Sequence, residues 1–284
     1  MNRKLRLFML TLAFLCCLGI MDYPFISRLY NERVQGAVAV SYDQMSKSLE
    51  DTERDQMMEA ARAYNAGLAA REPAGLQDAF QDTVTGTTEY EQLLNADEDG
   101  VMAVVEIPSI DVSLPVYHGT SEAVLQKGAG HLEGSSLPVG GESTHTCLSA
   151  HRGLPDKKLF TNLDLLKEGD IFYIRVLGET LVYEIYEIET VTPDQTQSLD
   201  IQQGRDLATL ITCTPYGINT HRLYVHGMRI DYQEEVEQQQ KQEAIRKNFW
   251  SLYWWIPVTI LLLLWMAGLL IWQLRTERTE EGQK

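Results

Sequence analysis

Short runs of β-branched and aromatic residues, separated by turn residues, fill the middle of the chain. We expect strands at Val101–Ile107, Val112–Tyr117, Thr144–Ala150, Asp170–Val176, Thr180–Val191, Leu207–Cys213 and Leu223–Ile230. Short helices fit at Ser121–Lys127 and Leu159–Leu166. Short strands at close spacing are typical of a β-barrel or a β-sandwich, so the chain is predicted to be mainly β.

The residues on either side of this region are predicted to be helical or irregular. Ser41–Ala70 has few helix breakers and a modest apolar stripe, so we expect a helix that packs lightly on the domain. Arg71–Glu91 contains a proline and two glycines and is expected to be a loop. Tyr232–Asn248 is polar and rich in Glu and Gln, which predicts a helical or flexible stalk.

An apolar segment near the C-terminus is long enough to cross a membrane. Leu252–Leu274 carries no formal charge over 23 residues. As a helix it would be about 34 Å long, enough for the hydrocarbon core of a bilayer. Trp254 and Trp255 lie near one end and Trp272 near the other, as aromatic residues do at membrane interfaces. A transmembrane helix is predicted.

A second apolar segment lies near the N-terminus. Leu7–Met21 follows Arg3, Lys4 and Arg6, a pattern that fits a signal peptide or an uncleaved anchor. No Ala-x-Ala cleavage site follows, which favours the anchor. The basic cluster predicts a cytoplasmic N-terminus. We therefore expect a multi-pass cell-membrane protein with both ends in the cytoplasm and the middle of the chain outside.

The composition limits both the class of partner and the kind of reaction that the protein could catalyse. The chain has 24 basic and 40 acidic residues, a formal net charge of −16, which argues against nucleic acid as a partner. Only Cys147 and Cys213 fall in the predicted exterior region, and one possible pair is not a disulfide framework. A free cysteine kept outside the cell indicates a chemical role for at least one of the two. No group of residues has the spacing of a zinc site, and no metal or cofactor is expected.

The segment Thr-Cys-Thr-Pro-Tyr-Gly-Ile-Asn-Thr-His-Arg places Cys213 at the end of an apolar run and Arg222 at the start of the next. A cysteine at the mouth of a strand has its sulfur near the surface of a rigid sheet. An arginine across one turn can return close to that sulfur, which would pair a thiolate with an anion-stabilising group. The plainer alternatives are a buried apolar cysteine, which fits Cys147 better, and a salt-bridging arginine.

This segment resembles the active-site signature of sortases, the cysteine transpeptidases of Gram-positive cell surfaces. The longer string resembles the pilin-polymerising branch, class C, and the resemblance runs over roughly Val101–Ile230. It implies a closed β-barrel of seven to eight strands, with Cys213 as nucleophile and Arg222 as a catalytic group. Leu-Ser-Ala-His-Arg-Gly resembles the family's catalytic-histidine motif and implies that role for His151, with Ala150 replacing the usual glycine.

The resemblance extends to supporting residues. Asp78-Ala-Phe80 resembles the Asp-Pro-aromatic lid of class C enzymes, although the proline is lost and the turn is less restricted in φ. It implies that Asp78 and Phe80 cover the active site; the plainer alternative is an ordinary exposed loop. His131, in Gly-Ala-Gly-His-Leu-Glu-Gly-Ser, and Thr212, beside the cysteine, are assigned supporting or substrate-binding places.

The implied reaction joins pilin subunits at the cell membrane. The Cys213 thiolate attacks the Thr–Gly carbonyl of a Leu-Pro-x-Thr-Gly-like sorting signal. His151 protonates the leaving amine and then deprotonates the lysine amine of the next pilin, while Arg222 stabilises the oxyanion or orients the peptide. The implied partners are pilin subunits and membrane lipid.

Other functions stay open at this point. A housekeeping sortase would use a peptidoglycan-precursor amine and anchor surface proteins to the cell wall. A cysteine L,D-transpeptidase would need a short His-Gly…Cys-x-Arg cluster, which this sequence lacks. A non-catalytic surface scaffold would show no thiol reactivity at Cys213.

The expected domain organisation has six parts. They are a signal-anchor or transmembrane segment at 1–21, a helical region with the candidate lid at 22–99, the barrel at 100–232, a polar stalk at 233–251, a transmembrane helix at 252–274 and a cytoplasmic tail at 275–284.

Overall fold

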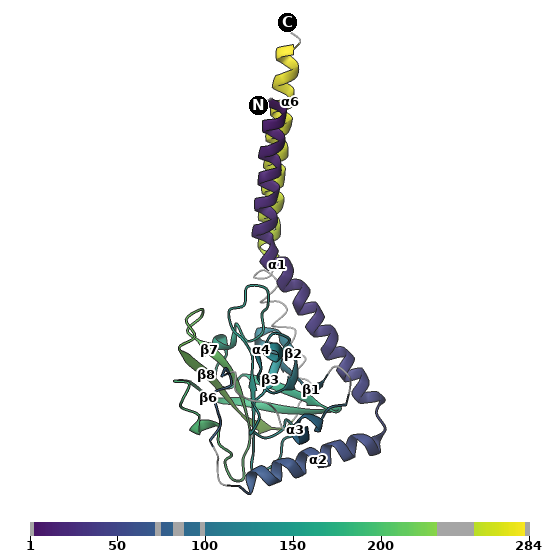
Figure 1. Ribbon diagram of the computed structural model, residues 1–284, viewed down its shortest axis with the longest axis vertical. Coiled ribbons are helices and arrows are strands. Elements are labelled where there is room, and N and C mark those ends of the chain that lie inside the picture. The colour runs from purple at the N-terminus through teal and green to yellow at the C-terminus, as the bar shows by residue number, and fades with distance from the viewer. Residues whose placement is uncertain (1–2, 72–74, 82–87, 97–99, 232–252, 282–284) are drawn as a thin grey trace. The chain divides into compact units, whose positions relative to one another are not determined.

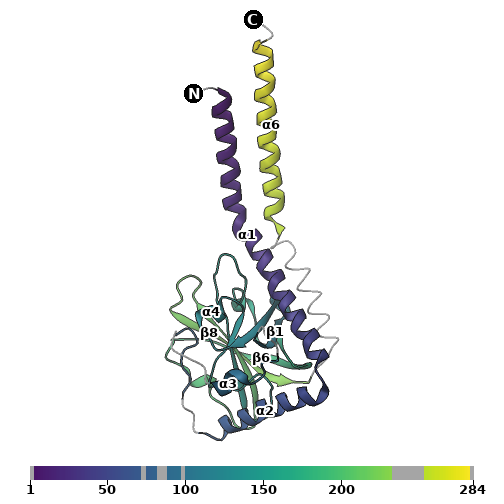
Figure 2. The same ribbon diagram turned by 45° about the vertical axis from the view of Figure 1, so that its right-hand side comes forward.

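The computed structural model describes residues 3–71, 75–81, 88–96, 100–231 and 253–281 (Figures 1 and 2). The chain divides into two compact units, one formed by Met1–Ile26 with Ile245–Lys284 and the other by Ser27–Ala244. The predicted stalk, Tyr232–Asn248, lies outside the described residues. The helices are α1 (Arg3–Ser48), α2 (Asp51–Ala69), α3 (Thr88–Gln92), α4 (Glu122–Leu125) and α6 (Trp255–Glu281).

Within the described residues, eight strands close into a barrel in the order β1-β2-β3-β4-β7-β8-β6-β5. The strands are β1 (Val101–Ile107), β2 (Val112–His118), β3 (Ala129–His131), β4 (Thr144–Ser149), β5 (Ile171–Val176), β6 (Glu179–Val191), β7 (Asp206–Thr214) and β8 (His221–Ile230). The β2–β3 and β4–β7 pairs are parallel and the others are antiparallel. The predicted mainly-β closed barrel is confirmed.

The two faces of β7 and β8 serve different purposes because side chains alternate along a strand. Ala208 and Leu210 of β7 join the main hydrophobic core, as do Leu223 and Val225 of β8. The opposite face carries a second, smaller apolar cluster, which includes Cys147, Ile211 and Tyr224 together with Ala79 and Leu199 from outside the sheet. This second face is the one that also carries Cys213, two residues beyond Ile211.

Helices α1 and α2 pack on the barrel through specific contacts. In α1, Ala39 and Tyr42 are buried against Val101 and Val104 of β1. The Tyr42 hydroxyl donates to the Met102 carbonyl at 2.8 Å and accepts from the Leu177 amide at 3.1 Å. In α2, Asn65 forms two hydrogen bonds with the backbone of Leu137. Polar side chains therefore fix how both helices sit on the sheet.

The helical region differs from the expectation. Ser41–Ala70 is not one helix: α1 ends at Ser48 and α2 begins at Asp51. Glu50 has an extended backbone, with φ −63° and ψ 142°, and acidic residues occupy the first turn of α2, where they stabilise a helix N-terminus. The first helix is also much longer than Leu7–Met21, because it continues through Pro24 to the barrel surface.

Short elements account for the remaining differences. The strand β3 was not expected because it has only three residues and contains Gly130, a poor strand former. That glycine is required here, since a Cβ would lie 2.3 Å from the Gly119 carbonyl oxygen. Leu159–Leu166 forms a 3₁₀ turn at Leu163–Leu165 instead of a helix, and α3 begins inside the expected loop.

The other unit pairs the first part of α1 with α6. Both helices contain a stretch long and apolar enough to cross a membrane. The Thr259 hydroxyl donates to the Asp22 carboxylate at 3.1 Å. Beside this contact, the Phe25 ring packs edge-on against Trp254 and stacks on Trp255. Polar and aromatic contacts therefore join the two helices at one end of their apolar stretches.

Candidate active site

Cys213 and Arg222 face each other across the β7–β8 ladder as direct register partners. Directly opposite residues of an antiparallel pair have Cα atoms about 4.5–5.5 Å apart and point to the same side of the sheet. The intervening turn is built by the sequence: Gly217 and Asn219 adopt positive φ, and the Pro215 carbonyl accepts from the amides of Ile218 and Asn219. The fold thus brings together the two residues that the sequence paired.

The guanidinium of Arg222 is buried and makes four hydrogen bonds that the structure describes. Its Nη1 donates to the carbonyls of Asn219 and His221, both at 3.1 Å. Its Nε donates to Oδ1 of Asp78 at 2.7 Å, and its Nη2 donates to Oδ2 at 2.6 Å. This bidentate arrangement fixes Arg222 to its own turn and to a distant segment of the chain.

That distant segment is Gly75–Gln81, which we call the covering segment. Asp78 and Ala79 are buried in it, and the Leu76 carbonyl accepts from the Thr196 hydroxyl at 2.8 Å. The Phe80 ring centroid lies 5.1 Å from the guanidinium carbon of Arg222 and 5.8 Å from the ring centroid of His151. The predicted lid residues therefore contact two of the three predicted catalytic residues.

Cys213 is only 7% exposed beneath these contacts. Burial raises the pKa of the thiol, the Arg222 guanidinium lowers it, and the Asp78 carboxylate raises it again. The net direction is upward, so the thiol is protonated at neutral pH in this arrangement. Removal of Asp78 and entry of water would weaken the two effects that raise the pKa of Cys213, the nearby carboxylate and burial. The Arg222 guanidinium would then favour the thiolate.

His151 lies just beyond the end of β4, and parallel pairing of β4 with β7 brings it to the edge of the sheet where Cys213 lies. The Thr212 hydroxyl donates to the Ala150 carbonyl at 2.8 Å, which links the residues next to Cys213 and His151. The His151 Nε2 lies 3.0 Å from Oε2 of Glu122. No hydrogen bond joins His151 to Cys213 among the described residues.

His131 is buried away from solvent. Its Nε2 donates to the Ser136 carbonyl at 2.8 Å, and its Nδ1 lies 2.7 Å from the Tyr90 hydroxyl. Burial lowers the pKa of His131 to about 4, so the ring is neutral. Its contacts link β3 to α3 and to the loop that follows β3.

Two contacts at this edge of the barrel escaped the sequence analysis. Glu122 was not singled out as a partner of His151. Arg152 pairs with Asp164 at 2.6 Å and donates to the Thr214 hydroxyl at 3.4 Å, so it joins the histidine segment to the residue after Cys213. The only sequence signal for Arg152 is its place directly after the histidine, and nothing local identifies Glu122.

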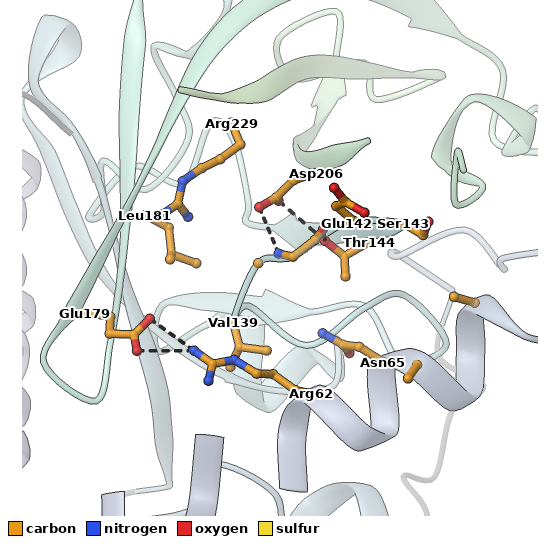
Figure 3. Close-up of a pocket in the computed structure, with 14 residues that line it drawn as sticks. Arg62, Asn65, Val139, Glu142, Ser143, Thr144, Glu179, Leu181, Asp206 and Arg229 are labelled. Carbon is orange, nitrogen blue, oxygen red and sulfur yellow. Dashed lines mark hydrogen bonds and ion pairs between the residues drawn. The ribbon is translucent and has the colours of Figure 1, made fainter. Parts of the chain in front are cut away.

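A cavity of about 490 Å³ lies at the other end of the barrel, beside α2 (Figure 3). Asp206, at the start of β7, accepts from the Gly141 amide at 2.8 Å and the Tyr183 hydroxyl at 3.0 Å. Arg62 of α2 pairs with Glu179 at 3.2 Å. These charged groups are satisfied by one another and by the backbone. The described residues hold no cluster of three or more His, Cys, Asp or Glu that suits a metal ion.

The family model described as a sortase domain matches residues 105–230. Among solved structures, Streptococcus pneumoniae sortase C is 46% identical with a TM-score of 0.65, over 70% of this chain and 98% of that chain. Sortase C1 of GBS pilus island 1 is 44% identical with a TM-score of 0.64, over 70% of this chain and 94% of that chain. The chain belongs to the sortase family. These structural neighbours are sortases of class C, and the predicted recognition is confirmed.

Curated sortases match over a smaller region. Sortase A of Streptococcus agalactiae serotype III (strain NEM316) is 30% identical over 156 residues, which is 54% of this chain and 61% of that protein. The chain thus spans less than two thirds of this relative's length. Sortases are cysteine transpeptidases of the cell envelope. A nucleophilic cysteine beside an arginine, at the edge of a barrel, agrees with that chemistry.

Proposed function

We propose that this chain is a membrane-anchored class C sortase that joins pilin subunits through lysine isopeptide bonds. The observation that carries the proposal is the Cys213–Arg222 register pair, buried beneath the covering segment. The neighbours add support, since one belongs to a pilus island and work on another concerns pilin substrate specificity. The substrate would be an LPxTG-like sorting signal cleaved between Thr and Gly.

The first half-reaction transfers the threonine acyl group to the enzyme. The Cys213 thiolate attacks the threonine carbonyl carbon, and the oxyanion forms next to the Arg222 guanidinium, which is oriented by the carbonyls of its own turn. As the C–N bond breaks, His151 gives its proton to the leaving glycine amine. The product on the enzyme is a thioester at Cys213.

The second half-reaction releases the enzyme. The ε-amine of a pilin lysine attacks the thioester carbon, and His151 accepts the proton that the amine loses. The C–S bond breaks, the thiolate of Cys213 is restored, and an isopeptide bond remains. His131 has a buried, neutral ring, so we propose for it a supporting place in the barrel wall, and for Thr212 a place beside the nucleophile.

The covering segment is proposed as a lid. Asp78 occupies the donors of Arg222 that a substrate oxygen would need, and Phe80 contacts both Arg222 and His151. Substrate must therefore bind an open form, and the closed form lowers the apparent affinity by the fraction of enzyme that is open. Two membrane spans with the barrel outside the cell complete the proposal.

The test is a full-length enzyme in detergent with a pilin that carries a sorting signal and a second pilin with its acceptor lysine. Wild type should yield a covalent dimer with an isopeptide bond between the new C-terminal threonine and a lysine. Cys213→Ala should abolish both cleavage and dimer, whereas Cys147→Ala should retain most activity. Equal loss from both changes in folded proteins would overturn the assignment of the nucleophile.

A cell-wall-anchoring function is the second candidate, because several curated relatives at 30–34% identity are sortases A. The same assay separates the two. If wild type transfers the threonine acyl group to a peptidoglycan-precursor amine and not to pilin lysine, anchoring is the function.

A further inference from the structure

The contact between His151 and Glu122 lies outside the bond-making and bond-breaking steps of the two half-reactions. Glu122 lies at the start of α4, and its Oε2 is 3.0 Å from Nε2 of His151. A carboxylate oxygen can only accept, so Nε2 must carry the hydrogen of this bond. Among the described residues, the other ring nitrogen, Nδ1, has no hydrogen-bond partner. The contact therefore distinguishes the two nitrogens of the ring.

The Glu122 carboxylate is itself held in one orientation. The Gln126 side chain donates from Nε2 to Oε1 of Glu122 at 2.7 Å. Lys157 in turn donates to the Gln126 backbone carbonyl at 2.7 Å and to its side-chain oxygen at 3.1 Å. These bonds matter because the Glu122 side chain is 61% exposed and would otherwise sample many rotamers.

Glu122 is ionised at neutral pH. The hydrogen bond from Gln126 lowers the pKa of this carboxyl most, and the charge of His151 and its hydrogen bond lower it further. The other groups near His151 do not supply a competing negative charge. Asp78 is bound to Arg222, Asp164 is bound to Arg152, and Phe80 contacts the imidazole with an uncharged ring.

We propose that Glu122 is a positioning residue that holds His151 through Nε2 and stabilises its protonated form. Nδ1 is then the nitrogen that gives a proton to the leaving amine and takes one from the incoming lysine amine. The Nε2 hydrogen stays on the ring throughout, so the ring gains and loses one proton per turnover. A general acid–base oriented by a third group follows the logic of other nucleophilic enzymes. The inference rests on the proposed function for its catalytic consequence.

Glu122→Gln tests the charge with little change of shape. The interaction free energy of an exposed ion pair is small. We therefore expect kcat/KM for cleavage of a sorting peptide to fall about two- to fivefold at neutral pH. The alkaline limb of the rate profile should move to lower pH, and the difference from wild type should shrink at high salt. Alkylation of Cys213 should be unchanged.

Two control variants separate this role from a general effect on the fold. Glu179→Gln makes the same substitution in an ion pair at the far end of the barrel, and it should leave both rate and profile unchanged. Gln126→Ala keeps the Glu122 charge but removes the bond that orients it. It should lower kcat and move the alkaline limb less than Glu122→Gln does.

The imidazole signals of His151, followed by NMR in full-length enzyme, test the contact without turnover. In Glu122→Gln the ring should lose its proton at a lower pH than in wild type, and in Glu179→Gln at the wild-type pH. A His151 titration and a rate profile in Glu122→Gln that both coincide with wild type would overturn the inference. If instead no sorting peptide is cleaved by wild type, the proposed function fails, while the NMR titration still decides whether Glu122 stabilises the protonated ring.

Discussion

Asp78 and Arg222 form a two-point ion pair across 144 residues of sequence, and the pair lies directly beside the Cys213 thiol. Both side chains are nearly inaccessible to water, at 3% and 8% exposure. The same pair therefore neutralises the arginine and discourages ionisation of the cysteine. Any substrate that needs Arg222 must displace Asp78.

Opening the covering segment should activate the thiol. Asp78→Ala with Phe80→Ala removes a carboxylate that raises the pKa of Cys213 and an aromatic cover over the site. The pKa of the thiol should fall, so the pH profile of alkylation should move to lower pH. Loss of the apolar cover, worth about 1.5–3 kcal/mol if complete, predicts alkylation faster by about tenfold to a hundredfold.

The control is Asp51→Ala, which removes an aspartate from an exposed ion pair at the start of α2. It should leave alkylation unchanged. Equal alkylation rates for wild type and the double variant would show that the covering segment does not limit access to the thiol.

Loss of the Thr212 hydroxyl should lower both the stability of the fold and the rate of peptide cleavage. Thr212→Val keeps the shape but leaves the buried Ala150 carbonyl without the hydroxyl that donates to it. An unpaired buried acceptor costs about 1–3 kcal/mol, so the urea midpoint should fall. Peptide cleavage should fall as well, because Ala150 directly precedes His151. Thr212→Ser retains the hydroxyl and should behave like wild type; a valine variant with unchanged midpoint and rate would contradict this prediction.

The free energy of unfolding should depend on two buried histidines. Burial lowers the pKa of His131 and of His145 to about 4, against an ordinary value of 6.5. Unfolding therefore takes up protons once the pH falls below about 6.5, and stability is lost as the pH falls from there toward 4. Each histidine contributes a slope of up to about 1.4 kcal/mol per pH unit in that window.

Urea unfolding between pH 7.5 and 5 measures this slope. His145→Gln should make the dependence shallower, even though it also loses the bonds to Asp200 and Thr209. A slope that His145→Gln does not reduce would mean that this ring is not buried in its neutral form.

The charges near the N-terminus predict the membrane topology. The basic cluster before the first apolar segment predicts a cytoplasmic start, and α6 would then return the chain to the cytoplasm. Protease added to protoplasts should digest the barrel and spare a tag at the C-terminus. Removal of the tag by protease would show that α6 does not return the chain to the inside.

The strands were predictable because their signal is local. Runs such as Val101–Ile107 alternate or continue in apolar residues and are bounded by turn residues, and β1 has the predicted bounds. β3 could not be found this way, since its three residues depend on pairing with β2 and β4. The break at Leu49–Glu50 has a local signal in the acidic first turn of α2, but it also reflects packing of the two helices on different parts of the barrel.

The residues of the candidate site also differ in whether local sequence could identify them. Cys213 and Arg222 are close in sequence and share one hairpin, so their pairing could be predicted from spacing. The prediction that Asp78 covers the site rested on a family resemblance, and its bond to Arg222 joins residues 144 positions apart in the sequence. The Glu122–His151 contact needs the relative placement of α4 and the loop after β4, which comes from tertiary structure alone.

The parallel pairing of β4 with β7 has an evolutionary consequence. Parallel strands end at the same rim of the barrel, so Cys213 near the end of β7 and His151 just beyond the end of β4 lie at that rim whatever the length of chain between them. The connection from β6 to β7 can therefore gain or lose residues without altering the spacing of the reacting groups. The length of that loop can therefore vary between related proteins while the register of β4 and β7 stays fixed.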